Sequence, residues 1–581
     1  MSAALLMVLL AGTPAAQQPA KALPPPKPPP AEKIPIVTNQ KFDDPILQTL
    51  ADEVSRAMSL KMAPQGSKDP ERPYYARAYL NTDAQFSVWA NFGAQYAPAQ
   101  GQQVKLGTAV RVGSPDLDNT NFQAGGFGFG MGEGRFSQPA ELDLDAVRRT
   151  LWLQFDMDFK RAVEAIARKR AYLETNQVKE RIADFAYAPP DKVLLDQQPI
   201  PKVDLEKWGG IVKRASAACR AFASPHSCVA GISGKTGCQR LVASDGAAHR
   251  FCETRIEVYV QANGQAADGM PVGADWKQYY RTEADLPTEA ELTAKVKEMG
   301  ELLEKKLKAP APTEDYAGPV LFTAEAAPAF FLSALANPLS QPRESLGASE
   351  QGRLIERLGK HIAVSQLSAF DDPTQPTWTS PAGKVFPLFG YFPVDDDGVK
   401  PQTIMLVKDG VLQTYYMSRL PTRRIAKTNG HARNEQGSTG SLFVSTSQPK
   451  PLAELKKKLV ELAKEEDLEY GLMVSRLPQA WESRPDTSLK LPNNPLLVWR
   501  VWADGREELI RGPAFRPTTF RVLKDIVMMG DDPTLLNTEQ FGQQVSAVAP
   551  STLVKLLELN KPRDEYGKPP VLPRPALAGG K

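Results

Sequence analysis

Glu325, near the middle of the chain, is the first residue to consider as a catalytic acid or base or as a metal ligand. Glu325 stands in Thr323-Ala-Glu-Ala-Ala-Pro-Ala329, with alanine at 324 and 329. A catalytic zinc needs about three ligands from His, Cys or carboxylate side chains and one open position for water. Alanine carries no lone pair, so Ala324 and Ala329 can bind no metal. Glu325 is then better explained as an acid at a helix start, where the helix dipole favours it, and Pro328 suits the first turn of that helix.

The other histidines and carboxylates of the C-terminal half do not indicate a stronger metal or catalytic site. His361 and His431 are the histidines of the C-terminal half, and each is better explained as a structural or surface residue than as a ligand. The acidic run 395–397 could bind calcium only with further oxygens from elsewhere, so a hydrated turn is the preferred interpretation. Nothing marks a serine or cysteine as a nucleophile paired with a base.

The four cysteines lie close together in the chain, at Cys219, Cys228, Cys238 and Cys252, and no two of them form a Cys-x-x-Cys pair. In an exported protein an even, clustered set favours disulfides. We therefore expect two disulfide bonds, although the spacing leaves all three possible pairings open.

The N-terminus resembles an export signal. Residues 3–12 are a short apolar run followed by small residues up to Ala16, although no Lys or Arg precedes the run. This pattern predicts a signal peptide at 1–16 and a periplasmic or extracellular protein. Residues 17–40 are rich in proline and predict a stiff tether. No later segment has the eighteen or more apolar residues that a membrane span needs.

Composition sets the remaining limits. The chain has 581 residues, with 70 Lys and Arg against 67 Asp and Glu, so its near-neutral charge of +3 gives no indication of nucleic-acid binding. The length is enough for two or more domains. We place them at 41–312 and 313–563, divided after the Pro-rich stretch 309–312, with a disordered tail at 564–581.

Periodicity predicts the main elements. Helical spacing of apolar residues indicates helices over 43–62, 143–173, 208–223, 287–308, 328–335, 452–466 and 552–559. Thr288 is the expected N-cap of the fourth. Residues 74–93 alternate as strands do, and Asp-Gly turns predict β-hairpins over 402–417 and 497–511.

Several short segments, in this order along the chain, resemble the TldD/PmbA family of proposed zinc-dependent peptidases. They are Val110–Phe122, Leu358–Ala363, Phe370–Pro373, Val394–Gly398, Ile404–Tyr416 and Val545–Val554. The resemblance extends from about residue 43 to residue 562. In the zinc-bearing branch of that family the six positions 324–329 read His-Glu-x-x-x-His, and a late cysteine is a further ligand. This chain keeps only Glu325 and has no cysteine after Cys252.

The resemblance implies a two-domain α+β protein that acts on or binds peptides. It implies an N-terminal α/β sandwich, a C-terminal β-rich barrel-like domain, and peptides as ligands. It also implies a homodimer, or a heterodimer with a zinc-bearing TldD-type subunit. The leading hypothesis is a pseudo-peptidase without a cofactor that supports such a partner. The alternatives are an active peptidase, with zinc in an unrecognised or shared-interface site, and a stand-alone peptide-binding or scaffold protein.

A peptide groove is expected in the C-terminal half, where an exposed strand could bind an extended peptide by strand addition. The polar loop 423–439 could line this groove, and it contains Arg423, Arg424, Asn429, Arg433 and Asn434. The alternative is a mobile surface loop without a binding role.

Overall fold

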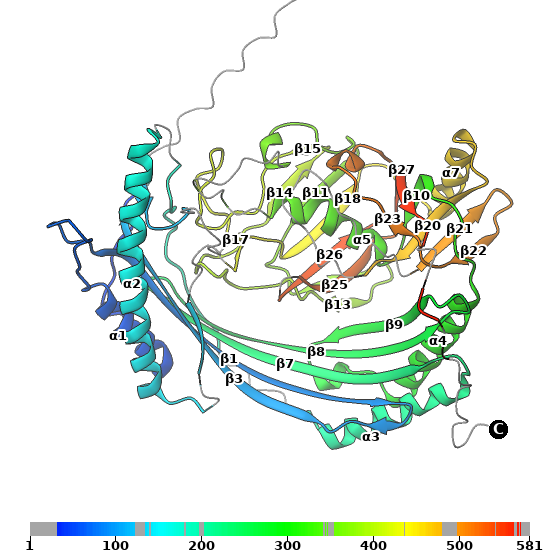
Figure 1. Ribbon diagram of the computed structural model, residues 1–581, viewed down its shortest axis with the longest axis horizontal. Helices are drawn as coiled ribbons and strands as arrows, with labels where there is room; N and C mark the ends of the chain where they lie inside the picture. The colour runs from blue at the N-terminus through cyan, green and yellow to red at the C-terminus, as the bar shows by residue number, and fades with distance from the viewer. Residues whose placement is uncertain are drawn as a thin grey trace, which may run out of the picture.

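The computed structural model describes residues 32–122, 134–138, 141–178, 182–196, 203–340, 343, 346, 354–434, 436–478, 497–540, 542–562, 566–568 and 570. The predicted signal peptide, the tether up to residue 31 and residues 571–581 lie outside the described part. The protein is a mixed α+β structure in which a long curved sheet partly encloses the C-terminal strands (Figure 1).

The curved sheet has nine strands and is built from the N-terminal half. Its order is β4-β3-β1-β7-β8-β6, and β2, β5 and β9 pair with β1, β3 and β8. The long strands are β1 (Pro73–Asn91), β3 (Ala99–Ser114), β7 (Ser227–Ala243), β8 (Ala248–Gln265) and β9 (Pro271–Tyr280). The short ones are β2 (Ala94–Gln95), β4 (Leu117–Asp118), β5 (Gly134–Gln138) and β6 (Lys192–Leu194).

The two faces of this sheet differ chemically because side chains alternate along a strand. Even-numbered residues of β1, such as Ala76, Ala78 and Leu80, are buried in apolar clusters. Four helices cover that convex face: α1 (Pro45–Ala57), α2 (Leu144–Thr175), α3 (Leu205–Ala217) and α4 (Glu289–Lys308). Odd-numbered residues, including Arg77, Tyr79 and Asp83, point to the concave side. The alternation therefore gives the sheet an apolar outer face and a polar inner face.

The C-terminal body (residues 316–560) lies on the concave side and contains two larger sheets (Figure 1). One has eight strands: β10 (Tyr316–Phe322), β19 (Pro449–Lys450), β20 (Tyr470–Arg476), β21 (Leu497–Trp502), β22 (Glu507–Ile510), β23 (Ala514–Phe515), β24 (Ile526–Gly530) and β27 (Thr552–Asn560). The other has six: β11 (Leu367–Asp371), β14 (Ile404–Lys408), β15 (Val411–Leu412), β18 (Ser441–Thr446), β25 (Thr534–Gln540) and β26 (Gln543–Ala549).

The remaining elements of the body are short. They are the ribbons β12 (Thr377–Thr379) with β13 (Val385–Pro387) and β16 (Ala432–Arg433) with β17 (Gln436–Gly437), and the helices α5 (Ala326–Phe331), α6 (Asn337–Leu339) and α7 (Leu452–Glu465). A π-helical turn over 332–336 joins α5 to α6. The strand orders of both larger sheets are open, so the expected barrel-like shape does not appear among the described strands.

Most predicted elements are confirmed. Thr288 caps α4 in a capping box with Glu291, and both hairpins form, as β14–β15 and β21–β22. The helix expected over 552–559 is wrong, because these residues form β27. β27 lies between β24 and β10, so pairing on both sides outweighs the helix propensity of its Leu, Lys and Glu residues.

The cysteines form the disulfides Cys219–Cys228 and Cys238–Cys252. Cys238 and Cys252 are direct partners in the β7–β8 ladder, so that bond joins neighbouring strands. The Cys219–Cys228 bond ties the end of α3 to the start of β7.

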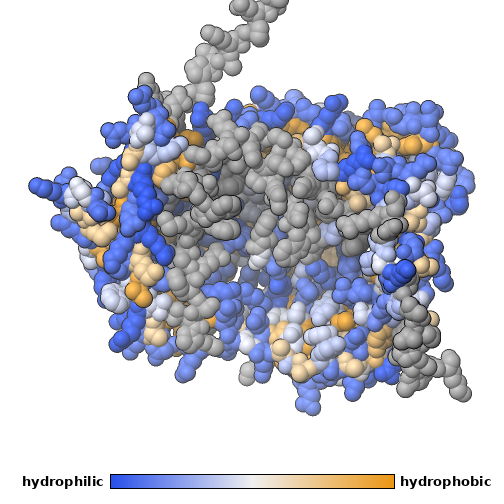
Figure 2. All heavy atoms as spheres, viewed as in Figure 1, coloured by the Kyte–Doolittle hydropathy of each residue, from blue (hydrophilic) through white to orange (hydrophobic). Residues whose placement is uncertain are grey.

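The outer surface is mainly polar. Hydrophilic side chains predominate on the face shown in Figure 2, with apolar ones scattered among them. In the described part of the chain, none of the helices combines the length and the apolar character needed to cross a bilayer.

Buried ion pairs hold the C-terminal body against the curved sheet. Arg419 is 1% exposed, and its guanidinium donates to Asp245 Oδ2 at 2.6 Å and to the Ala186 carbonyl at 3.0 Å. Arg77 of β1 bonds Asp397 at 2.8 Å. Arg419 also donates its backbone N–H to Asp397, so the two contacts form one network. This network fixes the body over the sheet.

Replacement of Arg419 by Met should lower the free energy of unfolding by about 3–5 kcal/mol, because Asp245 is fully buried and would lose its cation. Urea unfolding followed by circular dichroism measures the change. The additional change Asp245→Asn should recover part of the loss.

Arg424→Met is the matched control, because Arg424 is exposed in the same segment. It should shift the free energy of unfolding by no more than about 0.5 kcal/mol. Equal effects of Arg419→Met and Arg424→Met would show that the network does not stabilise the protein.

Candidate functional site

Glu325 lies at the start of α5, as the sequence predicts, and faces a cavity. The preceding residue, Ala324, has a φ of +48° and is exposed, and the chain turns there from β10 into the helix. Glu325 occupies the N-cap position, but its side chain makes no capping hydrogen bond. It lines a cavity of about 870 Å³ together with Ala329. The helix dipole alone therefore does not account for its orientation.

The Glu325 carboxylate is matched by an arginine. Its Oε2 lies 3.4 Å from Nε of Arg476, the last residue of β20. The same guanidinium contacts Asp275 Oδ2 of β9 at 3.0 Å through Nη2. Arg476 thus links α5 to the curved sheet across the cavity wall, and its single positive charge lies between two carboxylates that would otherwise repel each other.

The cavity beside Glu325, called the apolar cavity below, is lined by aromatic and aliphatic side chains from both parts of the chain. Six charged side chains also line it: Glu257, Asp275, Lys277, Glu325, Lys384 and Arg476. β8 and β9 supply Tyr259, Trp276 and Tyr279 from the curved sheet. The C-terminal body supplies a second set: Ala329, Leu332, Trp378, Phe386, Leu477, Leu535 and Leu536. Aromatic walls with a few charged groups are typical of sites that bind organic ligands or peptide side chains.

One wall of the apolar cavity is an edge strand. Residues 534–538 and 540 of β25 line the cavity. In the six-stranded sheet β25 pairs with β26 on one side, and no other described strand pairs with its outer edge. The backbone of an edge strand offers N–H and C=O groups to an extended peptide.

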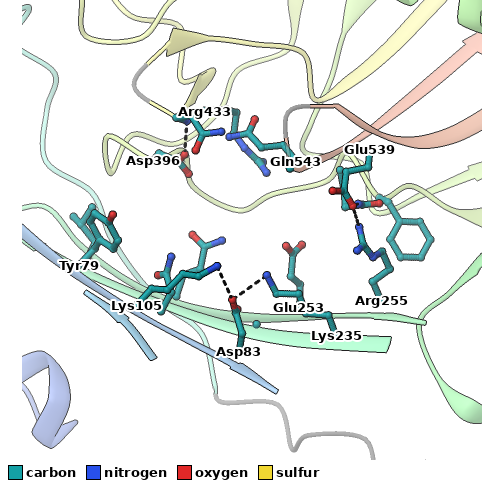
Figure 3. A pocket seen from close by; sticks show the side chains of 18 of the residues that line it. Tyr79, Asp83, Lys105, Lys235, Glu253, Arg255, Asp396, Arg433, Glu539 and Gln543 are labelled. Atoms are coloured by element: carbon teal, nitrogen blue, oxygen red, sulfur yellow. Dashed lines mark hydrogen bonds and ion pairs between the residues drawn. The ribbon is translucent and has the colours of Figure 1, made fainter. Parts of the chain in front are cut away.

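A second cavity, of about 270 Å³, lies further along the concave face and is called the polar cavity (Figure 3). Its walls carry Arg77, Lys105, Lys235, Arg255, Arg281 and Arg433, with the acids Asp83, Glu253, Asp396 and Glu539. Lys105 and Lys235 both contact Asp83, at 3.6 and 3.0 Å. This cavity therefore contains more basic than acidic side chains.

The curved sheet touches the C-terminal body between the two cavities. Arg255 of β8 pairs with Glu539 of β25 across the gap. Next to this pair, the rings of Tyr279 and Phe389 lie 5.6 Å apart, and the Arg281 guanidinium lies 4.3 Å from the Phe389 ring centroid. These contacts bridge the cleft that contains both cavities.

The predicted groove residues separate into three groups. Arg433 and Asn434 line the polar cavity. Asn429 is buried and has a structural role, because its amide binds the backbone of Tyr415 and Met417. Arg423 and Arg424 are exposed and line neither cavity. The loop 423–439 therefore contributes to the cleft mainly through two residues.

The acidic run 395–397 is not the hydrated turn that the sequence favours. Asp395 and Asp397 are buried, and Asp395 accepts backbone N–H groups from Asp397, Val399 and Ala432. Burial, and next the charge of Asp397, raise the pKa of Asp395 well above its usual value. The run anchors the loop beneath the polar cavity and contacts Arg77.

The two histidines of the C-terminal half differ in their exposure to solvent. His361 is exposed and lines neither cavity. His431 is fully buried, with Nε2 at 3.4 Å from Asp371 Oδ1 and Nδ1 at 3.0 Å from the Asn429 carbonyl. Tyr416 donates to the same aspartate, so His431 belongs to the internal packing of the C-terminal body.

The residues at positions 324–329 do not fit a zinc ion. Ala324 and Ala329 offer no donor atom, and the carboxylate of Glu325 already faces the guanidinium of Arg476. Arg476 places a positive charge beside this position, and a cation repels a second cation. These side chains can bind and orient a ligand.

Sequence reasoning missed the residues that the curved sheet contributes, among them Arg476's partner Asp275 and the cavity residues Arg281 and His249. A signal was present in β8, where the odd-numbered residues from 249 to 261 share one face. Which face meets the C-terminal body depends on packing, so the alternation alone could not assign them to a site.

Known proteins share this architecture. Residues 314–561 match the model of the PmbA/TldA metallopeptidase C-terminal domain. A metalloprotease from Archaeoglobus fulgidus is 33% identical over 79 residues, which cover 14% of this chain and only 16% of that protein's length.

Three solved structures have a similar fold over most of the chain. A protein proposed to modulate DNA gyrase from Thermotoga maritima aligns with a TM-score of 0.52 and 14% identity over 84% of this chain and 96% of its own. Another proposed gyrase modulator, from Bacteroides thetaiotaomicron, aligns with a TM-score of 0.56 and 12% identity over 88% of this chain and 98% of its own. TldE from Thermococcus kodakarensis aligns with a TM-score of 0.51 and 12% identity over 84% of this chain and 96% of its own.

The fold and the C-terminal domain define the class. The C-terminal part of the chain, residues 314–561, belongs to the TldD/PmbA family, and the proteins that the chain resembles include a metalloprotease and TldE.

A buried histidine makes the stability of the polar cavity depend on pH. His249 is 3% exposed, and burial, together with the charge of Arg77, lowers its pKa from 6.5 to about 3. The folded protein therefore keeps the ring neutral, whereas the unfolded chain binds a proton below about pH 6.5. The stability that the neutral ring allows is complete above pH 6.5 and is lost as the pH falls from 6.5 towards 3.

We expect His249→Gln to reduce the loss of stability on acidification. Between pH 7.5 and pH 4.5 the wild-type protein should lose about 2–3 kcal/mol more of its free energy of unfolding than this variant. Urea titrations at both pH values measure the difference. His361→Gln, at an exposed histidine, is the control and should follow the wild type. Parallel losses in all three proteins would contradict the prediction.

Proposed function

We propose that this protein is a metal-free pseudo-peptidase that binds extended peptides in the cleft between the curved sheet and the C-terminal body. The observation that carries the proposal is the pairing of Glu325 with Arg476 in the wall of the apolar cavity. The cavity retains the size and lining of a peptide site, while the acid that could serve as a base is neutralised by a fixed cation.

The lining supports a peptide rather than a small polar metabolite. An extended peptide can pair with the free edge of β25 and place alternate side chains against Trp378, Tyr259 and Trp276. Buried aromatic anchors supply most of the binding energy at such surfaces. Main-chain pairing gives affinity that depends little on sequence, and the aromatic wall then selects apolar side chains.

The zinc-bearing branch supplies the catalytic step in this proposal. The chain would present or hold peptides for a TldD-type partner that carries the His-Glu-x-x-x-His motif. The proposal includes the two-domain division near residue 312 and export from the cytoplasm, and the two disulfides support export because such bonds persist in oxidising compartments.

Peptide binding should be independent of metal. Purified protein is incubated with a pool of synthetic decapeptides, and mass spectrometry identifies the retained and the cleaved peptides, with and without EDTA. We expect retention without cleavage in both conditions and no stoichiometric zinc by elemental analysis. Glu325→Gln should retain the same peptides. Stoichiometric zinc with cleavage that Glu325→Gln abolishes would establish the active-peptidase alternative instead.

The site itself is tested with a matched pair of tryptophans. Trp378→Ala removes an anchor of the apolar cavity and should weaken retained peptides about tenfold or more. Trp152→Ala is the control, since Trp152 is 58% exposed on α2 and lines neither cavity, and its affinity should equal that of the wild type. Equal affinities in both variants would place peptide binding outside the apolar cavity.

The partner is tested in the source organism. Affinity capture of the tagged protein from gently solubilised cell-envelope fractions should co-purify a chain with the His-Glu-x-x-x-His motif, detected by mass spectrometry. Homodimers alone would remove the partnership from the proposal, and recovery only from the cytoplasmic fraction would contradict export.

A further inference from the structure

Among the described residues, no carboxylate contacts the charge of two arginines in the polar cavity, Arg281 and Arg433. Of its other cations, Arg77 pairs with Asp397, Arg255 with Glu539, and both lysines with Asp83. Within the described residues Arg281 and Arg433 take part in no ion pair. Burial lowers the pKa of Arg281, and the charge of Glu253 opposes that effect without direct contact.

Both arginines lie over the rings of phenylalanines of one segment. The guanidinium of Arg281 lies 4.3 Å from the Phe389 ring centroid, and that of Arg433 lies 4.6 Å from the Phe392 ring centroid. A guanidinium stacked by its face keeps its N–H edge available for a planar carboxylate.

The donors at these edges are only partly used. Arg281 donates to the carbonyls of Leu388 and Thr254, which leaves donors of its five unused. Arg433 Nε is buried and has no hydrogen-bond partner in the described structure. His249 also lines this cavity, and its buried Nδ1 lacks a partner in the described structure as well. Buried polar atoms without partners are costly, so they indicate a ligand.

The polar cavity continues the line of the apolar cavity. His249, Glu253 and Arg255 of β8 line the polar cavity, and Glu257, Tyr259 and Gln261 line the apolar one. All have odd numbers in one strand and therefore share a face, with about 7 Å between successive members. An extended chain that lies along the cleft passes from aromatic walls to stacked arginines.

We propose that the polar cavity binds the C-terminal carboxylate of a peptide whose preceding side chains lie in the apolar cavity, with Arg281 and Arg433 as the carboxylate ligands. The inference rests on the proposed peptide-binding function and adds a direction to it. The peptide enters with its C-terminus towards β1 and β7, and its interior residues lie beside Glu325. Selection of free C-termini would restrict ligands to peptide fragments and chain ends.

The test compares one decapeptide pool in two forms, as free acids and as C-terminal amides, which differ only in the terminal charge. Peptides retained by the wild-type protein are then synthesised individually in both forms for titration calorimetry. We expect the acid form to bind at least tenfold more tightly than the amide. Arg281→Met and Arg433→Met should each reduce this ratio to about two or less.

Arg506→Met is the matched control. Arg506 is also stacked on an aromatic ring, with its guanidinium 4.6 Å from the Trp502 centroid, but it is exposed and lines neither cavity. This variant should keep the wild-type ratio, and thermal melts establish that all three variants are folded.

The outcomes separate the two proposals. Equal binding of acids and amides by the wild-type protein overturns carboxylate recognition and leaves peptide binding intact. An acid preference that persists in both arginine variants also overturns the assignment, because the carboxylate would then bind elsewhere. Retention of neither pool overturns the peptide-binding function itself, and the carboxylate site with it.

Discussion

The buried ion-pair network of Arg419, Asp245, Arg77 and Asp397 is the contact on which the rest of the structure depends. It joins the curved sheet to the C-terminal body in a place with almost no access to water, where charges are stable only when each has a partner. Other contacts between the sheet and the body, such as Arg255–Glu539 and Arg476–Asp275, lie further along the concave face. The two cavities lie among these contacts.

The character of the cleft follows from alternation along long strands. One side of β1, β7 and β8 packs against helices and must be apolar, which leaves the opposite side free to carry charge. In the polar cavity the sheet therefore carries both basic and acidic side chains, and Arg433 of the C-terminal body faces them. Towards β9 the body contributes aromatic residues instead, so the cleft changes from charged to apolar along its length. An extended ligand would therefore contact charged side chains at one end and apolar side chains at the other.

Glu325 shows how a residue of catalytic type can keep its place and change its role. Its neighbour Arg476 supplies a permanent positive charge next to Asp275, so three side chains form a salt bridge that spans two parts of the fold. The sequence shows that Ala324 and Ala329 cannot bind a metal. It does not show the arginine, which is about 150 residues later in the chain and reaches Glu325 through the parallel pairing of β10 and β20.

The sequence by itself determined the helices that cover the sheet, the capped start of α4, both hairpins and the two alanines at 324 and 329 whose side chains cannot bind a metal, since each depends on local periodicity, turn chemistry or residue type. Only the tertiary structure decided that 552–559 is a central strand, that Asp395 and Asn429 are buried, and that Arg433 stands opposite β8 in one cavity. Those properties depend on which surfaces meet, and contacts between residues hundreds of positions apart leave no local pattern in the chain.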